Sequence, residues 1–167
     1  MKYFILTLSL FHFAFVFSQE DWVKLDFNDS TFIEFPEKPL YKKHQGQDLY
    51  TFMDSTGTYQ VLRLEMELGA DIQKEAVETR QFYSEFVRGL MDGAKGKIIS
   101  LDYVDIDGYI GVDCTYSLIP NGMELLCTSR IIALNDTIYS ISYTYLEGEW
   151  EKNKAYRKRF LNSANIN

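Results

Sequence analysis

Histidine and cysteine are scarce in this chain, and their scarcity excludes several kinds of site. The 167 residues contain two histidines and two cysteines. His12 lies in an apolar leader, so His44 is the only imidazole in the rest of the chain. A metal site with several histidines, or a relay between two histidines, is therefore excluded there.

Proline is also rare, and there is no internal repeat, low-complexity tract or Pro/Gly/Ser-rich linker. Each of the three prolines, Pro36, Pro39 and Pro120, stands where a secondary-structure segment is expected to end. The chain lacks the length for a second domain of ordinary size. These features predict one continuous domain.

Positive charge is in deficit. Lysine and arginine number 17 against 24 acidic residues, giving a formal net charge of -7. The acidic residues are spread along the chain rather than gathered in a tail. This balance disfavours binding to the phosphate backbone of a nucleic acid, so we expect no nucleic-acid partner.

Residues 1–18 have the pattern of a secretory signal peptide. One lysine precedes an almost wholly apolar stretch without acids, and small residues, Val16 and Ser18, stand three and one positions before a cut at Gln19. The run is shorter than the ~20 apolar residues of a spanning helix. The residue directly after the cut is not a cysteine, so it cannot carry a lipid anchor. We expect cleavage after Ser18, a secreted or periplasmic product without a membrane anchor, and a single domain over residues 19–167.

Two segments have the periodicity of amphipathic helices. The first runs from Asp71, a suitable N-cap, to about Met91, and Gly93 and Gly96 follow it. Its apolar stripe comprises Ile72, Ala76, Tyr83, Phe86, Val87 and Leu90. The second runs from Glu149 to about Ser163, with Trp150, Tyr156, Phe160 and Leu161 as its docking residues.

Most of the remaining chain is expected to form antiparallel strands. Short strands are predicted at residues 23–27 and 31–35, and a hairpin at residues 49–54 and 59–68 turns at residues 55–57. Residues 98–145 alternate as a meander. Together these predict an α+β fold, with a meander-rich antiparallel sheet of about six to eight strands packed by a central and a C-terminal helix.

The turns of this meander predict its register. A two-residue turn at Asp107-Gly108 pairs Leu101 with Cys114 and Ile99 with Tyr116, all on one apolar face. A four-residue loop at 119–122 then pairs Leu118 with Met123. For the last strand, a two-residue turn at 135–136 would place its serines on the apolar face. We therefore expect a loop of odd length, which places its tyrosines on that face instead.

The same register sets Cys114 opposite Cys127. Directly opposed strand positions lie close enough for a disulfide, and export favours oxidation. The alternatives are a cross-strand disulfide and two buried thiols. Both alternatives give the cysteines a structural role, because a redox pair usually takes the form Cys-x-x-Cys at a helix start.

No constellation favours a catalytic or metal-binding function over a structural one. Asp105 to Gly108 resembles the start of a calcium loop but lacks the later oxygen ligands. His44 lies in a polar run, residues 41–47, typical of a solvated loop and without a nucleophile motif. The acidic pairs Glu65/Glu67 and Glu147/Glu149 have the spacing of a solvated strand face. We therefore expect no catalytic, cofactor-binding or metal-binding residue and no cofactor.

Aromatic residues are frequent, at 16% of the chain. A line of them on the last strand and in the first helix could form a pocket or an exposed patch, and core packing is the favoured interpretation. These residues are Tyr139, Tyr143, Tyr145, Phe82, Tyr83 and Phe86.

A family resemblance follows from three of these features. The segment from Phe32 to Pro39 (FIEFPEKP) after an export signal, the central helix with its long meander, and the closing RFLNS at residues 159–163 resemble small secreted bacterial proteins of the PsbP-like fold group. The resemblance implies a sheet sandwiched by helices and a role in binding proteins or as an accessory subunit. No functional residue of the group has a matching motif here.

The expected function is an exported, non-enzymatic binding or accessory domain. Its partner would be a protein or small ligand, bound on one sheet face or at a rim that the helices leave open. The alternative is a secreted hydrolase-like enzyme using His44 or a carboxylate in a pocket. That alternative requires His44 or two close carboxylates at the bottom of a concave pocket.

Overall fold

The computed structural model of the protein describes residues 22–27, 31–44, 46–66, 72–73 and 76–166. The predicted signal peptide, residues 1–18, and the predicted N-cap Asp71 lie outside these residues. Within them no helix is both long and apolar enough to cross a membrane.

The main body is a seven-stranded antiparallel sheet in the order β3-β4-β5-β9-β8-β7-β6. Its strands are β3 (Leu40–His44), β4 (Gln47–Met53), β5 (Thr58–Glu65), β6 (Lys97–Ile106), β7 (Tyr109–Leu118), β8 (Leu125–Leu134) and β9 (Thr137–Leu146). The α+β class and the number of sheet strands predicted from the sequence are confirmed.

A second, three-stranded sheet in the order β1-β2-β10 was not predicted. The predicted N-terminal strands appear as β1 (Val23–Asp26) and β2 (Thr31–Phe35), and β10 (Asn165–Ile166) joins them from the other end of the chain. Ser163 connects the same regions, because its Oγ accepts a hydrogen bond from the Glu34 backbone N–H at 3.1 Å. A two-residue strand is too short to give a sequence pattern, which is why β10 was missed.

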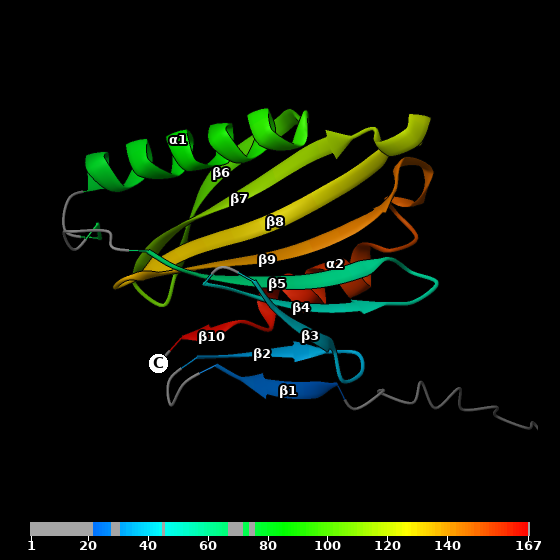
Figure 1. Cartoon of the computed structure of the whole chain (residues 1–167), viewed down its shortest axis with the longest axis horizontal. Helices are drawn as coiled ribbons and strands as arrows, with labels where there is room; N and C mark the ends of the chain where they lie inside the picture. Colours follow the sequence, from blue (N-terminus) through cyan, green and yellow to red (C-terminus); the bar gives the residue numbers. More distant parts are fainter. Residues whose placement is uncertain (1–21, 28–30, 45, 67–71, 74–75, 167) are drawn as a thin grey trace, which may run out of the picture.

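Helix α1 (Ala76–Ala94) begins later than predicted and covers β6 and β7 (Figure 1). Its inner side buries Thr79, Tyr83, Val87 and Met91. Of the predicted stripe, Ala76 and Leu90 are exposed instead, because only part of the sheet lies under the helix. We call the sheet face under this helix the α1 face.

The end of α1 depends on close packing. Lys95 takes the left-handed conformation with φ of 54°, and the Gly96 N–H returns to the Met91 carbonyl at 2.9 Å. A Cβ at Gly96 would lie 2.8 Å from Met91 Sδ and 2.9 Å from Leu118 Cδ2. Gly96 therefore allows the chain to pass directly from the helix into β6.

Helix α2 (Lys154–Asn162) lies on the opposite side of the large sheet, which we call the α2 face (Figure 1). It is shorter than predicted, because a 3-10 turn, η2 (Glu147–Glu149), precedes it. Phe160 and Leu161 are buried as predicted, Trp150 is half-buried, and Tyr156 is 40% exposed. Arg157 is buried in its place, with its guanidinium carbon 3.5 Å from the ring centroid of Trp150.

A bidentate ion pair ties the end of α2 to the middle of the sheet. Arg130 donates from Nε and Nη2 to the two carboxylate oxygens of Asp113, each at 2.8 Å. Its Nη1 donates to the Leu161 carbonyl at 3.1 Å and to Asn162 Oδ1 at 3.0 Å. One side chain therefore holds β7, β8 and α2 together.

The register of β6 and β7 agrees with the sequence as far as Leu101, which pairs with Cys114. Beyond it, a bulge between Ile98 and Ser100 brings Ile98, rather than Ile99, opposite Tyr116. Ile99 is 55% exposed as a result. A bulge of this kind displaces one residue from the pairing, and alternation alone does not reveal it.

The predicted register of β7 and β8 is wrong by two residues. Leu118 pairs with Leu125, because the connection holds a 3-10 turn, η1 (Pro120–Gly122), in place of a four-residue loop. Cys114 lies opposite Ser129, and Cys127 opposite Tyr116. The cysteines are diagonal neighbours on adjacent strands, and both are buried free thiols.

The predicted odd-length loop between β8 and β9 is also wrong. A two-residue turn, Asn135-Asp136, pairs Leu134 with Thr137 and Ile131 with Ser140. The tyrosines of β9 are nevertheless buried, on the α2 face. The prediction assumed that only one sheet face was covered, whereas α1 and α2 cover parts of both.

Candidate binding site

One end of the large sheet carries a hollow built by three connections. They are the turn between β4 and β5, the segment that follows η1, and the end of β9 with η2 (Figure 1). We call it the rim hollow. Its volume is about 350 Å³.

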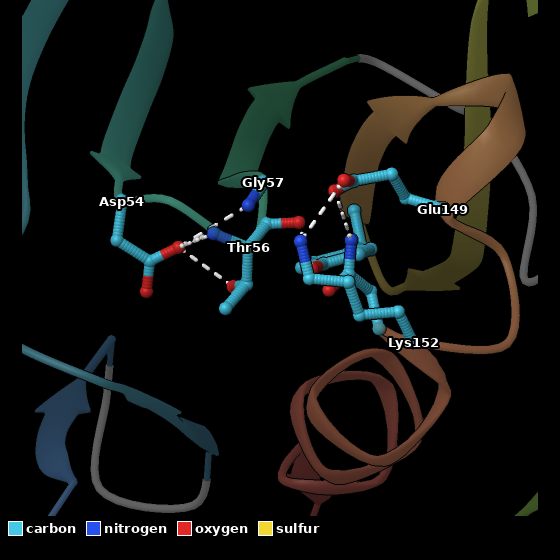
Figure 2. Close-up of polar contacts among 7 residues, drawn as sticks. Asp54, Thr56, Gly57, Glu149 and Lys152 are labelled. Atoms are coloured by element: carbon cyan, nitrogen blue, oxygen red, sulfur yellow. Dashed lines mark hydrogen bonds and ion pairs between the residues drawn. The ribbon is translucent and has the colours of Figure 1, made fainter.

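The β4–β5 turn forms one wall of the hollow. Asp54 Oδ1 accepts hydrogen bonds from the Thr56 N–H at 2.7 Å, the Thr56 hydroxyl at 2.6 Å and the Gly57 N–H at 3.2 Å (Figure 2). The Asp54 N–H also donates to the Gly57 carbonyl at 3.1 Å. Aspartate at this position of a turn satisfies the backbone groups that the turn leaves unpaired. Hydrogen bonds within residues 54–57 therefore fix the conformation of this wall.

The turn is anchored to the core beneath it. The Tyr143 hydroxyl donates to the Thr56 carbonyl at 2.7 Å, and the hydroxyls of Thr56 and Tyr59 lie 2.8 Å apart. A Cβ at Gly57 would come within 2.6 Å of the Thr144 carbonyl oxygen, so this position needs glycine. The hollow thus rests on Tyr59 and Tyr143, which are both fully buried.

The opposite wall is formed by the approach to α2. Glu149 accepts from Lys152 Nζ at 2.9 Å through one oxygen and from Asn153 Nδ2 at 3.2 Å through the other (Figure 2). These donors hold the pKa of Glu149 below its usual value. Glu149 is therefore ionised at neutral pH, which does not suit a general acid.

Three apolar side chains that line the hollow are exposed. Met53 is 73% exposed, Met123 55% and Leu146 48%. Met53 ends β4, Met123 follows η1 and Leu146 ends β9, and all three line the hollow. Methionine is flexible and polarisable and recurs at surfaces that bind varied partners. Sequence reasoning missed these residues, because isolated methionines beside turns form no pattern.

Carboxylates surround these apolar side chains. Asp54 and Glu149 line the hollow. The Glu147 N–H donates to the Glu124 carbonyl at 3.4 Å, so these two exposed acids lie side by side next to Met123 and Leu146. The site has an apolar centre and an acidic border.

Of the predicted acid–base candidates that the structure describes, Glu65 lies on β5 and Glu149 lines the rim hollow, so these two are separate. Glu65 pairs with Arg63 at 2.8 Å, and Glu67 lies outside the described residues. His44 is the last residue of β3 and its backbone pairs with Gln47, whereas its side chain lies outside the description. The solvated loop predicted around His44 is wrong, because residues 40–44 form an edge strand that turns back at Gly46, with φ of +78°.

The calcium-like segment is a hairpin turn, as predicted. Asp107 and Gly108 have φ of 54° and 88°, and Asp105 Oδ1 accepts from the Gly108 N–H at 3.1 Å. Among the residues that the structure describes, no group of three His, Cys, Asp or Glu side chains has the arrangement of a metal site.

The predicted aromatic core is confirmed. Tyr139, Tyr143 and Tyr145 are at most 3% exposed on the α2 face, and Tyr83 is fully buried under α1. Phe82 and Phe86 pack partly buried beside Tyr83. Tyr145 also lines the rim hollow, so one side chain links the core to the site.

No family model and no curated protein sequence matches this chain. Solved structures do match it. Cyanobacterial PsbP (CyanoP) from Synechocystis sp. PCC 6803 aligns with a TM-score of 0.63 and 12% identity, over 89% of this chain and 94% of that one. LpqN of Mycobacterium tuberculosis, involved in cell envelope biogenesis, aligns with a TM-score of 0.50 and 7% identity, over 87% of this chain and 90% of its own.

A protein from Bacteroides thetaiotaomicron VPI-5482 also aligns, with a TM-score of 0.52 and 15% identity, over 82% of this chain and 45% of that one. Identities this low establish the shared architecture and no shared site. The architecture is nonetheless common to nearly the whole length of CyanoP and most of this chain. The chain therefore has the PsbP-like fold, which its sequence resemblance predicted.

Proposed function

We propose that the protein is an exported, non-enzymatic accessory domain that binds a partner protein at the rim hollow. The partner segment it recognises carries apolar and basic side chains together. The observation that carries this proposal is the convergence of Met53, Met123 and Leu146, all at least 48% exposed, on one hollow.

The apolar centre supports protein binding in preference to catalysis. Exposed apolar side chains that gather in one place, with polar residues around them, are typical of interaction sites. The two carboxylates that line the hollow are held by their own neighbours, Asp54 by its turn and Glu149 by Lys152 and Asn153. Neither geometry offers a proton to a substrate in the hollow.

The acidic border supports a basic partner. Asp54 and Glu149 line the hollow, Glu124 and Glu147 follow Met123 and Leu146 in the chain, and the whole chain has a formal net charge of -7. Charge complementarity across an interface raises the association rate and selects against acidic partners. The partner is therefore expected to bind more weakly as the salt concentration rises.

Export is supported by the apolar leader at residues 1–18 and by the neighbours in structure. LpqN is involved in cell envelope biogenesis, and the PsbP-like fold spans most of this chain. An accessory role outside the cytoplasm fits both observations.

Two synthetic 18-residue peptides test binding at the rim hollow. One alternates leucine and lysine faces along a helix, and the other replaces every lysine with glutamate. The lysine peptide is expected to bind at least about tenfold more tightly by calorimetry, which corresponds to about 1.4 kcal/mol. Equal binding of both peptides would contradict the proposal.

Matched variants locate the binding. The double variant Met53→Ser/Met123→Ser should weaken the lysine peptide about tenfold or more, because it removes two apolar contacts. Val77→Ser is the control, since Val77 is 77% exposed near the start of α1, at the other end of the sheet (Figure 1). An effect of the control equal to that of the methionine variant would place the binding elsewhere.

Export has its own test. The full chain expressed in a bacterial host should appear outside the cytoplasm with the mass of a protein that starts at Gln19. Leu8→Arg, which interrupts the apolar stretch, should hold the uncut chain in the cell. An uncut wild-type chain in the cytoplasmic fraction would contradict export without affecting the binding test.

A further inference from the structure

A second hollow lies on the α1 face, where the helix stops short of the middle of the sheet. It is bounded by the C-terminal half of α1 and by β4, β5, β7 and β9, and its volume is about 200 Å³. Leu90 of α1, 37% exposed, stands on one side, and the half-buried Leu49 and Leu62 stand on the other. We call it the helix-side cavity.

The cavity exists because β9 places small residues where the sheet needs large ones to fill the space. Ser140 and Ser142 form part of its lining, and their cross-strand partners on β5 are Leu62 and Gln60. On the other side of the same strand, Ile141 and Tyr143 are fully packed. Strands favour β-branched and aromatic residues, so two serines at these positions leave the sheet hollow on one side.

Three of the lining residues, Tyr116, Ser140 and Ser142, belong to a row of hydroxyl groups that Ser129 completes. Ser142 Oγ lies 2.6 Å from Ser129 Oγ and 3.4 Å from Ser140 Oγ. Ser129 Oγ donates to the Tyr116 hydroxyl at 3.3 Å. Each hydroxyl can donate once and accept twice, so the row can rearrange to donate to or accept from a polar group placed over it.

Charge is absent from this lining. The described residues that line the cavity include no aspartate, glutamate, lysine, arginine or histidine, although 25% of the whole chain is charged. An ionised ligand would lose its hydration there without gaining a counter-charge. The rim hollow, in contrast, is bordered by carboxylates.

We infer that the helix-side cavity is a binding site for a small uncharged amphiphile. The ligand would place one hydroxyl, amide or ester group over Ser140 and Ser142. Its apolar chain or ring would lie between Leu90 of the helix and Leu62 of the sheet. Ligand pockets of drug size occupy about 300–1,000 Å³, so a cavity of 200 Å³ takes a small molecule rather than a helix or strand of a partner.

The first test uses the uncharged fluorescent probe N-phenyl-1-naphthylamine, whose emission rises in apolar surroundings, with the mature domain. The probe is expected to bind one molecule per chain. 1-Octanol should displace it at a concentration at least about tenfold below that of octanoate, a difference of about 1.4 kcal/mol. No gain in fluorescence, or equal displacement by octanol and octanoate, would overturn the inference.

The second test places the site. Ala94→Trp puts a large ring at the mouth of the cavity from an exposed helix position and should weaken probe binding about tenfold or more. Ala155→Trp makes the same change at an exposed position of α2 and should leave it unchanged. An unchanged affinity in Ala94→Trp, with the fold verified by circular dichroism, would overturn the inference.

The third test addresses the hydroxyl row. Ser142→Ala should weaken 1-octanol about fivefold, the loss expected for one hydrogen bond of about 1 kcal/mol, and should change probe binding less. Met53→Ser/Met123→Ser should alter neither, since those residues belong to the rim hollow. Loss of octanol binding in the methionine variant would assign the ligand to the rim hollow and overturn the inference.

Discussion

The two faces of the large sheet are built from the same strands but packed in opposite ways. On the α2 face, Tyr59, Tyr143 and Phe160 are fully buried, and their rings meet edge to face with centroids 4.9–5.1 Å apart. On the α1 face, the same strand β9 offers Ser140 and Ser142, and the helix covers only part of the sheet. Each face therefore has a buried apolar cluster, and on the α1 face a cavity also remains beside the helix.

The difference between the faces extends to the way each helix is attached. Helix α2 enters the aromatic cluster through Phe160 and is tied by Arg130. Helix α1 packs Val87 and Met91 into a second apolar cluster, and its Tyr83 hydroxyl donates to the Ile110 carbonyl and accepts from the Ala133 N–H, both at 2.8 Å. Helix α2 is thus tied into an aromatic cluster, whereas α1 combines aliphatic packing with the two hydrogen bonds of one tyrosine.

The largest expected effect is the loss of the aromatic core. Phe160→Ala should lower the free energy of unfolding by about 3–5 kcal/mol, because it removes a fully buried ring and leaves a cavity. Leu62→Ala, on the half-open α1 face, should cost about 1 kcal/mol, since its side chain is only half-buried. Urea denaturation measures both, and equal losses would break the comparison between the faces.

A smaller effect is expected at alkaline pH. Burial raises the pKa of the Cys114 thiol from 9.0 to about 11, so the folded state keeps its proton when the unfolded state has lost it. This contribution is complete below about pH 9 and is lost as the pH rises toward 11. Between pH 8.5 and pH 10.5, the free energy of unfolding should fall by about 2 kcal/mol more in the wild type than in Cys114→Ala.

All other ionisable groups are the same in both proteins, so the difference between the wild type and Cys114→Ala isolates the thiol. An identical pH dependence in the two proteins would mean that burial does not raise the pKa of the Cys114 thiol. Slow reaction of the native protein with a thiol reagent at pH 8 is the independent check, since both cysteines are buried.

The attachment of α1 gives the third prediction. Tyr83→Phe should cost about 1–3 kcal/mol, because the buried Ala133 N–H loses its partner. Tyr156→Phe is the matched control, since Tyr156 is 40% exposed, and should stay within about 0.5 kcal/mol of the wild type. Hydrogen exchange in α1 should accelerate more than exchange in α2, and uniform acceleration would show that α1 is not separately held.

The smallest effect is expected in the hydroxyl row. Ser129→Ala and Ser142→Ala should each cost about 1 kcal/mol, because each leaves a hydroxyl without its 2.6 Å partner. The double variant should cost less than the sum, with a coupling of about 0.5–1 kcal/mol. Strict additivity of the two substitutions would show that the hydroxyls do not interact.

The sequence was sufficient to predict the elements that depend on local patterns. The Asp107-Gly108 turn fixed the start of the β6–β7 register, and the alternation of β7 correctly assigned Val112 and Cys114 to the α1 face. These predictions hold because a two-residue turn and a period of two leave few alternatives.

The predictions that failed depended on contacts distant in sequence. Alternation predicts an odd-length β8–β9 loop only when a single sheet face is covered, and Lys42 and Lys43 make β3 as polar as a loop. Lysines are common on exposed edge strands, and β3 lies at the edge of the sheet. The rim hollow was missed because Met53 and Met123 stand 70 residues apart and meet only in the folded chain.

The pairing of β2 with β10 constrains the stage of synthesis at which the protein can fold. Glu34 and Ser163 are hydrogen-bonded across 129 residues, and Ile33 and Phe35 pack against Phe160. A nascent chain that has not yet added residues 154–166 lacks both α2 and the third strand of the small sheet. Synthesis must therefore be almost finished before the aromatic core can close, so the growing chain stays incompletely folded until then.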